Sequence, residues 1–367
     1  MQLLKMPSAL REQIGQMMVS GFEGTALNSQ TEDLIVNHHI GGLILFERNF
    51  KNPEQLTRLI GDLQKLALSS PPFAPLFISV DQEGGRVSRL QSPFTRFPTP
   101  CCLGNARSET LAQRFGLALG REMRAVGINM DYAPILDVNT NPDNPIIGTR
   151  AFSNAPEWAG KLGVAFLKGF KEAGVLAVGK HFPGHGDTSQ DSHLTLPSVD
   201  RDSITLENVE LAPFSAAIQN GLEVIMTAHV IYKAWDEKYP ATFSVPILKN
   251  LLRKKLGFQG LIISDDLEMK AVEDHIPFAS YPALGTNAGV DLFLICHDTE
   301  KVKALVKQME QDAIAGTIPR AVIEDSVRRI LEVKGRMPAP ESGLCDLASL
   351  AQAHQPLVEE MQSYLAT

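Results

Sequence analysis

The feature that most constrains the fold is a pattern repeated along the chain: an amphipathic helical segment, a short apolar run, then a polar or glycine-rich loop. Eight apolar runs of strand length occur, seven of them after a clear helical segment, at 17–21, 42–46, 76–80, 129–133, 174–178, 224–227, 261–263 and 292–295. Strands that alternate with helices in this way form parallel sheets with helical crossovers. Eight such units in a chain of 367 residues predict an α/β fold, a single closed (β/α)8 barrel of the TIM type.

An open, doubly wound sheet is the alternative arrangement of alternating helices and strands. That fold needs a glycine-rich phosphate-binding turn after its first strand, and residues 21–24, Gly-Phe-Glu-Gly, lack the pattern. We therefore favour the barrel. We expect one catalytic barrel domain over residues 1–337, with extra C-terminal helices at 301–314 and 320–333, and a tail at 338–367 that forms one helix.

Composition limits the partners and the compartment. The chain is 44% hydrophobic and 21% charged, which is typical of a soluble globular protein, and no apolar run approaches the roughly 18 residues needed to span a membrane. The formal charge of -8, with no basic stripe, argues against nucleic acid. The four cysteines, with Cys101 and Cys102 adjacent, suit neither a zinc site nor a disulfide framework. We expect a cytoplasmic protein without a signal peptide, a monomer or weak oligomer, that acts on a small molecule.

Polar side chains follow the predicted strands at their C-terminal ends: Glu47, Arg48, Asp81, Glu83, Asp137, Lys180, His181, His229, Asp265 and Asp298. In an α/β barrel these strand ends meet on one face, and that face carries the active site. We interpret Asp137 and His229 as hydrogen-bonding residues that stiffen the floor of such a site. The sequence therefore predicts one cluster of carboxylates, imidazoles and basic side chains.

The densest group of titratable residues is the segment 180–193, Lys-His-Phe-Pro-Gly-His-Gly-Asp-Thr-Ser-Gln-Asp-Ser-His, directly after the fifth apolar run. It holds three of the nine histidines, and its proline and glycines break regular structure. Within it we interpret His185 and Asp187 as loop architecture. A strand that ends in such a loop is a common place for a scaffold to display chemistry.

Two groups could together cleave a glycosidic bond. Asp265 follows the buried run 261–263, so a rigid carboxylate there could attack an anomeric carbon and form a covalent glycosyl-enzyme, unless Asp266 reacts and Asp265 caps the next segment. Such a reaction also needs a group that protonates the leaving oxygen and later activates water. His193, oriented by Asp191 two residues earlier, can serve because the pKa of histidine lies near neutrality.

Seven segments between residues 41 and 267 resemble the family 3 glycoside hydrolases, specifically the bacterial β-N-acetylhexosaminidases of peptidoglycan recycling. They are Gly41-Gly-Leu-Ile-Leu-Phe46, Asp81-Gln-Glu-Gly-Gly-Arg-Val-Ser-Arg89, Asp131-Tyr-Ala-Pro-Ile-Leu-Asp-Val138, Asn144-Pro-Ile-Ile-Gly-Thr-Arg150, the 180–193 segment, Met226-Thr-Ala-His229 and Ser264-Asp-Asp-Leu267. The 180–193 segment is the most specific of them, and it is similar to the N-acetylglucosaminidase branch.

The resemblance implies a retaining exo-β-N-acetylglucosaminidase that removes terminal N-acetylglucosamine from β-linked glycans such as muropeptides, with no cofactor and no metal. By resemblance, Asp265 is the nucleophile, His193 the general acid/base and Asp191 its partner. The residues implied to bind the terminal sugar are Asp81, Arg89, Arg150, Lys180 and His181.

Two positions carry further expectations. Family members commonly have Asp where this chain has Thr149, which leaves open what orients Arg150. Gly184 and Gly186 permit backbone angles that other residues resist, so we interpret them as a hinge that lets the loop carry His193 over bound sugar.

Three other functions stay open at this point. A phosphorylase would use the same groups, because a histidine acid/base does not repel an incoming phosphate as a carboxylate would. A metal-dependent barrel hydrolase would need ligands such as His181, His185, His193 and Asp265 to converge on one ion. A non-catalytic muropeptide-binding protein would tolerate the loss of Asp265.

Overall fold

The computed structural model describes residues 4–192, 194–338 and 347–365. Eight parallel strands form one sheet in the order β11-β9-β7-β6-β3-β2-β1-β12, and a parallel bridge between Ile263 and Leu292 joins its two ends. The sheet is thus a closed barrel, which confirms the predicted fold and excludes the open doubly wound sheet. The barrel strands are β1 (Met18–Ser20), β2 (Gly42–Leu45), β3 (Phe77–Val80), β6 (Met130–Asp131), β7 (Leu176–Phe182), β9 (Val224–Thr227), β11 (Leu261–Ile263) and β12 (Phe293–Ile295).

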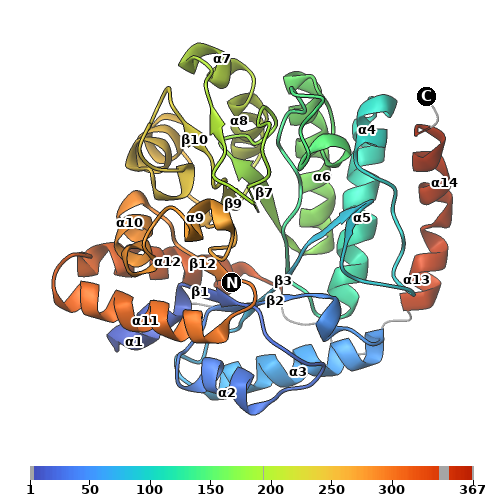
Figure 1. Ribbon diagram of the computed structural model, residues 1–367. Helices are drawn as coiled ribbons and strands as arrows, with labels where there is room; N and C mark the ends of the chain where they lie inside the picture. Colours follow the sequence, from blue (N-terminus) through green and yellow to red (C-terminus); the bar gives the residue numbers. More distant parts are fainter. Residues whose placement is uncertain (1–3, 193, 339–346, 366–367) are drawn as a thin grey trace.

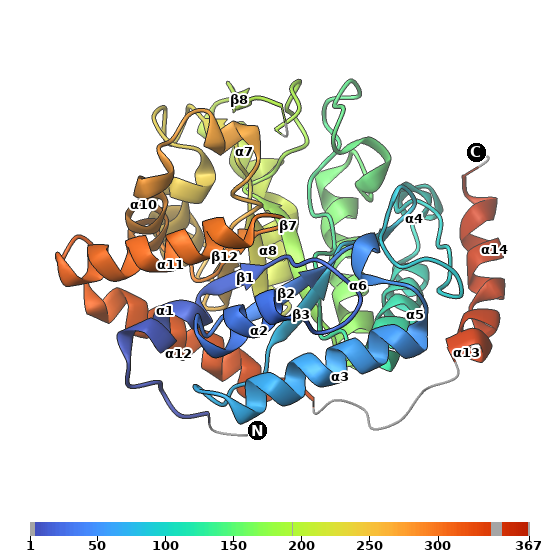
Figure 2. The ribbon, with the colours of Figure 1, turned by 60° about the horizontal axis from the view of Figure 1, so that its bottom comes forward.

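Helices surround the barrel and return the chain from the end of one strand to the start of the next (Figures 1 and 2). The larger ones are α1 (Leu10–Gln16), α2 (Ser29–Val36), α3 (Pro53–Ser69), α5 (Glu109–Ala125), α6 (Pro156–Ala173), α8 (Leu211–Gln219), the π-helix η4 (Pro246–Lys255), α10 (Tyr281–Ala288), α11 (Thr299–Ile314) and α12 (Arg320–Arg336). In α3 the Asn52 side chain caps the first turn and Pro53 occupies its start, while Leu56, Leu59 and Leu63 face the barrel.

Short elements lie in the loops. They are the strands β4 (Gln82–Gly84), β5 (Val87–Ser88), β8 (Ser198–Val199) and β10 (Ile231–Tyr232), the helices α4 (Cys101–Ala106), α7 (Ser203–Asn208) and α9 (Lys270–Glu273), and the 3-10 turns η1 (Glu47–Asn49), η2 (Gly148–Arg150), η3 (Ala241–Phe243) and η5 (Phe278–Ser280). Of these, the antiparallel pair β4–β5 matters most for the site, because it carries Glu83 and leads to Arg89.

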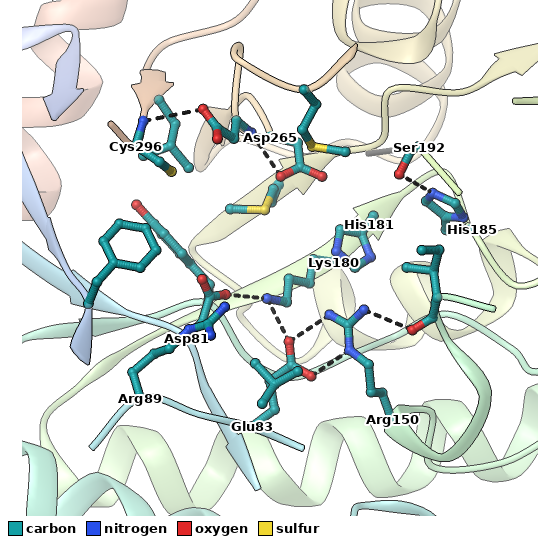
Figure 3. Close-up of a pocket in the computed structure, with 18 of the residues that line it drawn as sticks. Asp81, Glu83, Arg89, Arg150, Lys180, His181, His185, Ser192, Asp265 and Cys296 are labelled. Atoms are coloured by element: carbon teal, nitrogen blue, oxygen red, sulfur yellow. Dashed lines mark hydrogen bonds and ion pairs between the residues drawn. The ribbon is translucent and has the colours of Figure 1, made fainter. Parts of the chain in front are cut away.

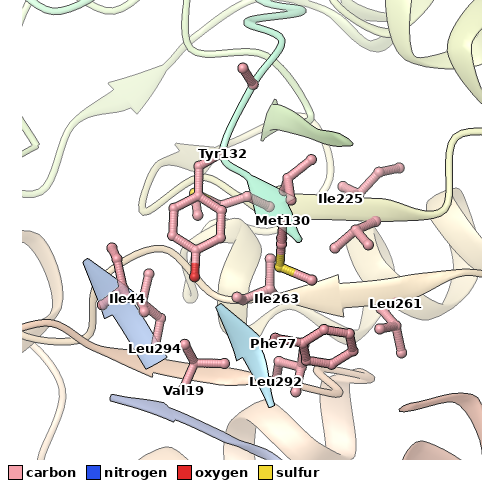
Figure 4. Close-up of a cluster of buried hydrophobic side chains, with 14 of the residues drawn as sticks. Val19, Ile44, Phe77, Met130, Tyr132, Ile225, Leu261, Ile263, Leu292 and Leu294 are labelled. Carbon is pink, nitrogen blue, oxygen red and sulfur yellow. The ribbon is translucent and has the colours of Figure 1, made fainter. Parts of the chain in front are cut away.

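The interior of the barrel is filled with apolar side chains, as Figure 4 shows. Val19, Ile44, Phe77, Met130 and Ile263 come from different strands and are all buried. Such layers of branched and aromatic side chains make the barrel a packed core rather than a pore. Cavities for ligands are therefore expected only at its ends.

One strand differs from the prediction in a way that bears on the site. β7 runs from Leu176 to Phe182, so Lys180 and His181 belong to the strand and do not follow it. The apolar run 174–178 covers only the first half of β7. The second half buries the polar side chains of Lys180 and His181, which pair with Asp81, Glu83 and Asp137. The register between β7 and β9 shifts between Gly179 and Phe182.

The tail also differs from the prediction of a single helix. It contains α13 (Leu347–Ala353) and α14 (Gln355–Ser363), which are separated at His354. Pro356 lies in the first turn of α14, where its missing N–H costs nothing, and a continuous helix through it would lose a backbone hydrogen bond. The pair packs on α4 and α5 (Figure 1). No helix in the described ranges is long and apolar enough to cross a bilayer.

Candidate active site

A cavity of about 410 Å³ opens at the C-terminal ends of the barrel strands (Figure 3). The five residues predicted to bind sugar all line it, and so does the predicted nucleophile: Asp81, Arg89, Arg150, Lys180, His181 and Asp265. These residues come from segments far apart in the sequence, and the barrel brings them together as expected. Phe46, Met226 and Met269 add apolar surface to the wall.

A network of two basic and two acidic side chains forms one side of the cavity (Figure 3). Lys180 Nζ lies 2.7 Å from Asp81 Oδ1 and 2.8 Å from Glu83 Oε1. Arg150 donates two hydrogen bonds to Glu83, from Nε at 2.8 Å and from Nη2 at 2.7 Å. The charges balance within the network, so its four charged side chains can line the cavity with little contact with bulk water.

Burial disfavours the charged forms of Glu83 and Lys180, but the opposite charges beside them favour these forms more strongly. For Glu83, the cations of Arg150 and Lys180 outweigh burial and hold the pKa far below its usual range. For Lys180, the carboxylates of Asp81 and Glu83 outweigh burial and raise the pKa of the ammonium. Both groups therefore stay ionised at neutral pH. The sequence predicted Glu83 in the polar cluster at the strand ends but did not assign it to the sugar-binding residues, although two buried basic residues need two carboxylates for charge balance.

The orientation of Arg150, left open by Thr149, is set by other groups. Glu83 holds the guanidinium from one side, and the carbonyl oxygen of Ile146 accepts a bond from Nη1 at 3.1 Å. Thr149 contributes through its backbone, because its carbonyl oxygen accepts a bond from Thr99 Oγ1 at 2.7 Å. Arg150 thus has fixed geometry without an acidic neighbour in sequence.

Arg89 retains hydrogen-bonding capacity toward the cavity. It lies beside the ring of Phe46, with the guanidinium carbon 5.9 Å from the ring centroid. Its Nε atom is buried and has no hydrogen-bond partner within the described ranges. A buried donor of this kind is costly to leave unpaired.

His181 is held by the carboxylate predicted to stiffen the floor. Its Nδ1 atom lies 2.8 Å from Asp137 Oδ2, and Asp137 Oδ1 accepts the backbone N–H groups of His181 and His185. Burial raises the pKa of Asp137, but the imidazole of His181 outweighs it and the net shift is downward. An ionised carboxylate at Nδ1 favours the imidazole form with the proton on that nitrogen, which leaves Nε2 for other contacts.

Asp265 directs its carboxylate toward the cavity from the end of β11 (Figure 3). One oxygen accepts the backbone N–H of Asp266 at 2.8 Å. Burial favours the neutral acid, but the imidazoles of His181 and His229 and the Asp266 amide outweigh it, so the pKa of Asp265 falls below normal. His229 is fixed in turn by Thr242, at 2.7 Å, as predicted for a residue that stiffens the site.

Asp266 also borders the cavity but is differently engaged. Its Oδ1 accepts the backbone N–H groups of Glu268 and Cys296, at 3.1 and 3.2 Å, which ties the loop after β11 to the end of β12. Burial raises the pKa of Asp266 to about 7. Of the two adjacent carboxyl groups, Asp265 therefore has the larger ionised fraction at neutral pH. Asp266 fixes the loop after β11.

The loop that follows β7 is pinned within the cavity wall. His193, the predicted acid/base, lies outside the described residues, while Asp191 and Ser192 are described. Ser192 lines the cavity, and its Oγ lies 3.1 Å from His185 Nε2. His185 Nδ1 lies 2.7 Å from Thr188 Oγ1, and burial lowers the pKa of His185 to about 4. With both ring nitrogens in hydrogen bonds, His185 acts as loop architecture, as predicted.

The two glycines of this loop are required by close packing. A methyl group on Gly186 would lie 1.6 Å from the carbonyl oxygen of Val138. Gly184 has φ +137°, and a methyl group there would lie 2.7 Å from the side chain of Glu210. The backbone at Gly186 packs directly against the loop at Val138, and the hinge interpretation of the two glycines stays a prediction.

A closed α/β barrel whose mouth holds a fixed carboxylate facing a paired-charge network is an arrangement suited to a glycosidase of the barrel class. Residues 9–333 match the family model described as the glycosyl hydrolase family 3 N terminal domain. The chain belongs to glycosyl hydrolase family 3, as its sequence motifs imply, and is a glycoside hydrolase.

Similar proteins agree with this assignment. A protein named Beta-hexosaminidase from Alkalilimnicola ehrlichii is 40% identical over 302 residues, which cover 81% of this chain and 84% of that protein. The structure of a family 3 β-N-acetylglucosaminidase from Paenibacillus sp. is 38% identical with a TM-score of 0.90, covering 97% of this chain and 68% of that one. The native NagZ structure from Neisseria gonorrhoeae is 33% identical with a TM-score of 0.80, covering 94% of this chain and 97% of its own.

Proposed function

We propose that the protein is a retaining exo-β-N-acetylglucosaminidase that removes terminal N-acetylglucosamine from β-linked glycans. The observation that carries this proposal is the position of an ionised Asp265 across the cavity from the Lys180–Asp81–Glu83 network. The similar proteins whose names include Beta-hexosaminidase and β-N-acetylglucosaminidase support the substrate class.

The polar wall suits the recognition of one sugar ring. A pyranose presents adjacent hydroxyl groups that both donate and accept hydrogen bonds. Carboxylate oxygens of Asp81 can accept such bonds, and Arg89, Arg150 and Lys180 can donate them. A volume of about 410 Å³ is within the range of small-molecule sites, which supports one terminal residue as the ligand.

Catalysis would proceed in two steps. In the first, a carboxylate oxygen of Asp265 bonds to the anomeric carbon, the bond to the leaving oxygen breaks, and His193 gives that oxygen a proton. In the second, a water molecule bonds to the anomeric carbon while His193 takes its proton, and the ester bond to Asp265 breaks. Asp191 would orient His193 and stabilise its cation. These roles rest on the family resemblance of the 180–193 segment.

We further propose that the natural substrates are muropeptides released during cell-wall recycling. This finer assignment is supported by the similarity to NagZ over nearly the whole length of both chains. It predicts that the cavity receives the terminal N-acetylglucosamine while the rest of the muropeptide lies at the rim.

Parallel assays with an aryl N-acetyl-β-glucosaminide and an aryl β-glucoside test the proposal. We expect turnover of the first and little of the second. The assay is repeated in phosphate and in an inert buffer, because formation of N-acetylglucosamine 1-phosphate would assign the protein as a phosphorylase. Loss of activity in a chelator would support the metal-dependent alternative, and binding of muropeptides without turnover by the unaltered protein would support the non-catalytic one.

A further inference from the structure

The C-terminal helix pair makes a buried polar contact with the barrel helix α5 through the residue between its two helices. His354, between α13 and α14, is 8% exposed, and its Nδ1 lies 2.7 Å from Glu122 Oε1 on α5. Glu122 is 1% exposed. A carboxylate buried to this extent must be matched by donors, so His354 is part of what makes the burial of Glu122 possible.

Glu122 has its other contacts in a segment that follows the β4–β5 hairpin. Its Oε2 accepts the backbone N–H of Thr95 at 2.8 Å, and its Oε1 accepts the hydroxyl of Thr95. Thr95 is 4% exposed and follows Arg89 by six residues in the chain. The ring of Phe97 packs between Phe115 and His354, with centroid distances of 5.2 and 6.0 Å. Tail and barrel therefore hold residues 94–99 from two sides.

The 94–99 segment in turn supports the β4–β5 hairpin, which carries Glu83. The Gly85 N–H donates to the carbonyl oxygen of Phe97 at 2.9 Å. Gly84 has φ +89°, and a methyl group on it would lie 2.7 Å from the carbonyl oxygen of Pro98. The hairpin is thus seated on the backbone of the segment with no space between them.

The 94–99 segment also contacts the backbone next to Arg150, the partner of Glu83. Thr99 Oγ1 donates to the carbonyl oxygen of Thr149 at 2.7 Å, next to Arg150. Both sides of a bidentate ion pair in the cavity wall are therefore supported by one stretch of backbone. A shift of that stretch would move the carboxylate and the guanidinium relative to each other.

We infer that His354 is a positioning residue for the sugar-binding side of the cavity, and that the C-terminal helix pair acts through Glu122 and the 94–99 segment on Glu83 and Arg150. The expected effect on catalysis rests on the proposed function. The physical coupling between His354 and the cavity wall does not, because it can be measured without substrate.

The test compares three variants by two measurements. His354→Ala removes the donor, and His354→Asn keeps one, because the Asn amide nitrogen occupies nearly the place of Nδ1. Met361→Ala, in the buried face of α14, is the matched control for loss of tail stability. Hydrogen exchange is followed in peptides covering residues 82–99, and KM and kcat are measured with the aryl N-acetyl-β-glucosaminide.

We expect His354→Ala to speed exchange at the Gly85 and Thr95 amides and to raise KM on the order of tenfold, with a smaller change in kcat. His354→Asn should show the exchange rates and the KM of the unaltered protein. Met361→Ala should lower the Tm but change neither the exchange rates nor KM. If His354→Ala does not fold, Thr95→Val replaces it with the same expectations.

Unchanged exchange, or faster exchange with unchanged KM, would overturn the inference, and so would an equal rise of KM in Met361→Ala. Failure of the unaltered enzyme to cleave the aryl substrate would overturn the proposed function instead. The coupling would then be judged by hydrogen exchange and by binding of N-acetylglucosamine.

Discussion

Lys334 is a buried base whose removal should change how stability depends on pH. It projects from α12 and is 2% exposed; its Nζ donates to Gln16 Oε1 at 2.8 Å and lies 5.0 Å from the centroid of Phe77. Among the described residues, no neighbouring charge offsets the burial of its ammonium group. Burial lowers the pKa of Lys334 from 10.5 to about 7. The perturbation we consider is Lys334→Met, which has similar length and no charge.

The sign and size follow from proton linkage. Between pH 7 and 10.5 the unfolded chain binds a proton at Lys334 that the folded chain does not, so stability rises with pH across this window. The burial of Lys334 costs about 4 kcal/mol at pH 7 and about 2 kcal/mol at pH 9. Lys334→Met removes this cost. It also leaves Gln16 Oε1 without its donor, which destabilises the folded protein by about 1–3 kcal/mol at every pH.

Urea unfolding followed by circular dichroism at pH 7, 8 and 9 provides the assay. The free energy of unfolding of Lys334→Met minus that of the unaltered protein should fall by about 2 kcal/mol from pH 7 to pH 9, because all other titrating groups cancel. Lys307→Met, at an exposed position on α11, should give a flat difference. An equally flat difference for Lys334→Met would refute the reasoning.

Three further predictions concern the site and its support. Asp265→Ala should lower kcat by about 10⁴-fold or more while the fold is kept, and the unaltered enzyme should release the β-anomer first by proton NMR. Burial raises the pKa of Glu210 from 4.5 to about 8, so stability falls as pH rises through this window. Glu210→Gln should stabilise by about 1 kcal/mol at pH 5 and about 3 kcal/mol at pH 7 in urea unfolding; a constant gain would contradict this. Gly186→Ala should lower the Tm, because its methyl group meets the Val138 carbonyl, and an unchanged Tm would argue against the packing account.

The sequence by itself determined the barrel and the location of its site. The alternation of helical segments and apolar runs is a local property, and it predicted all eight barrel strands to within a few residues. Because strand ends in a barrel share one face, polar residues after those runs were expected to converge. Asp81, Lys180 and Asp265 do line one cavity, whereas Glu47 and Asp298 do not.

Other features followed only from the tertiary structure. The apolar residues alone did not predict the end of β7, because Lys180 is stabilised inside the strand by the carboxylates of Asp81 and Glu83, which are distant in sequence. The close approach of Gly186 to Val138 is likewise a contact between separate segments. The sequence places Gly186 in a loop but does not show which backbone it contacts.

The physical reason for this division is the range of the interactions. Helical periodicity and strand length are set by neighbours a few residues away, so they can be predicted from the sequence. The pairing of Glu83 with Arg150 joins residues 67 apart, and that of Glu122 with His354 joins residues 232 apart. Which charges meet, and hence which stay ionised beside the substrate cavity, was decided by the closure of the barrel and the packing of the tail.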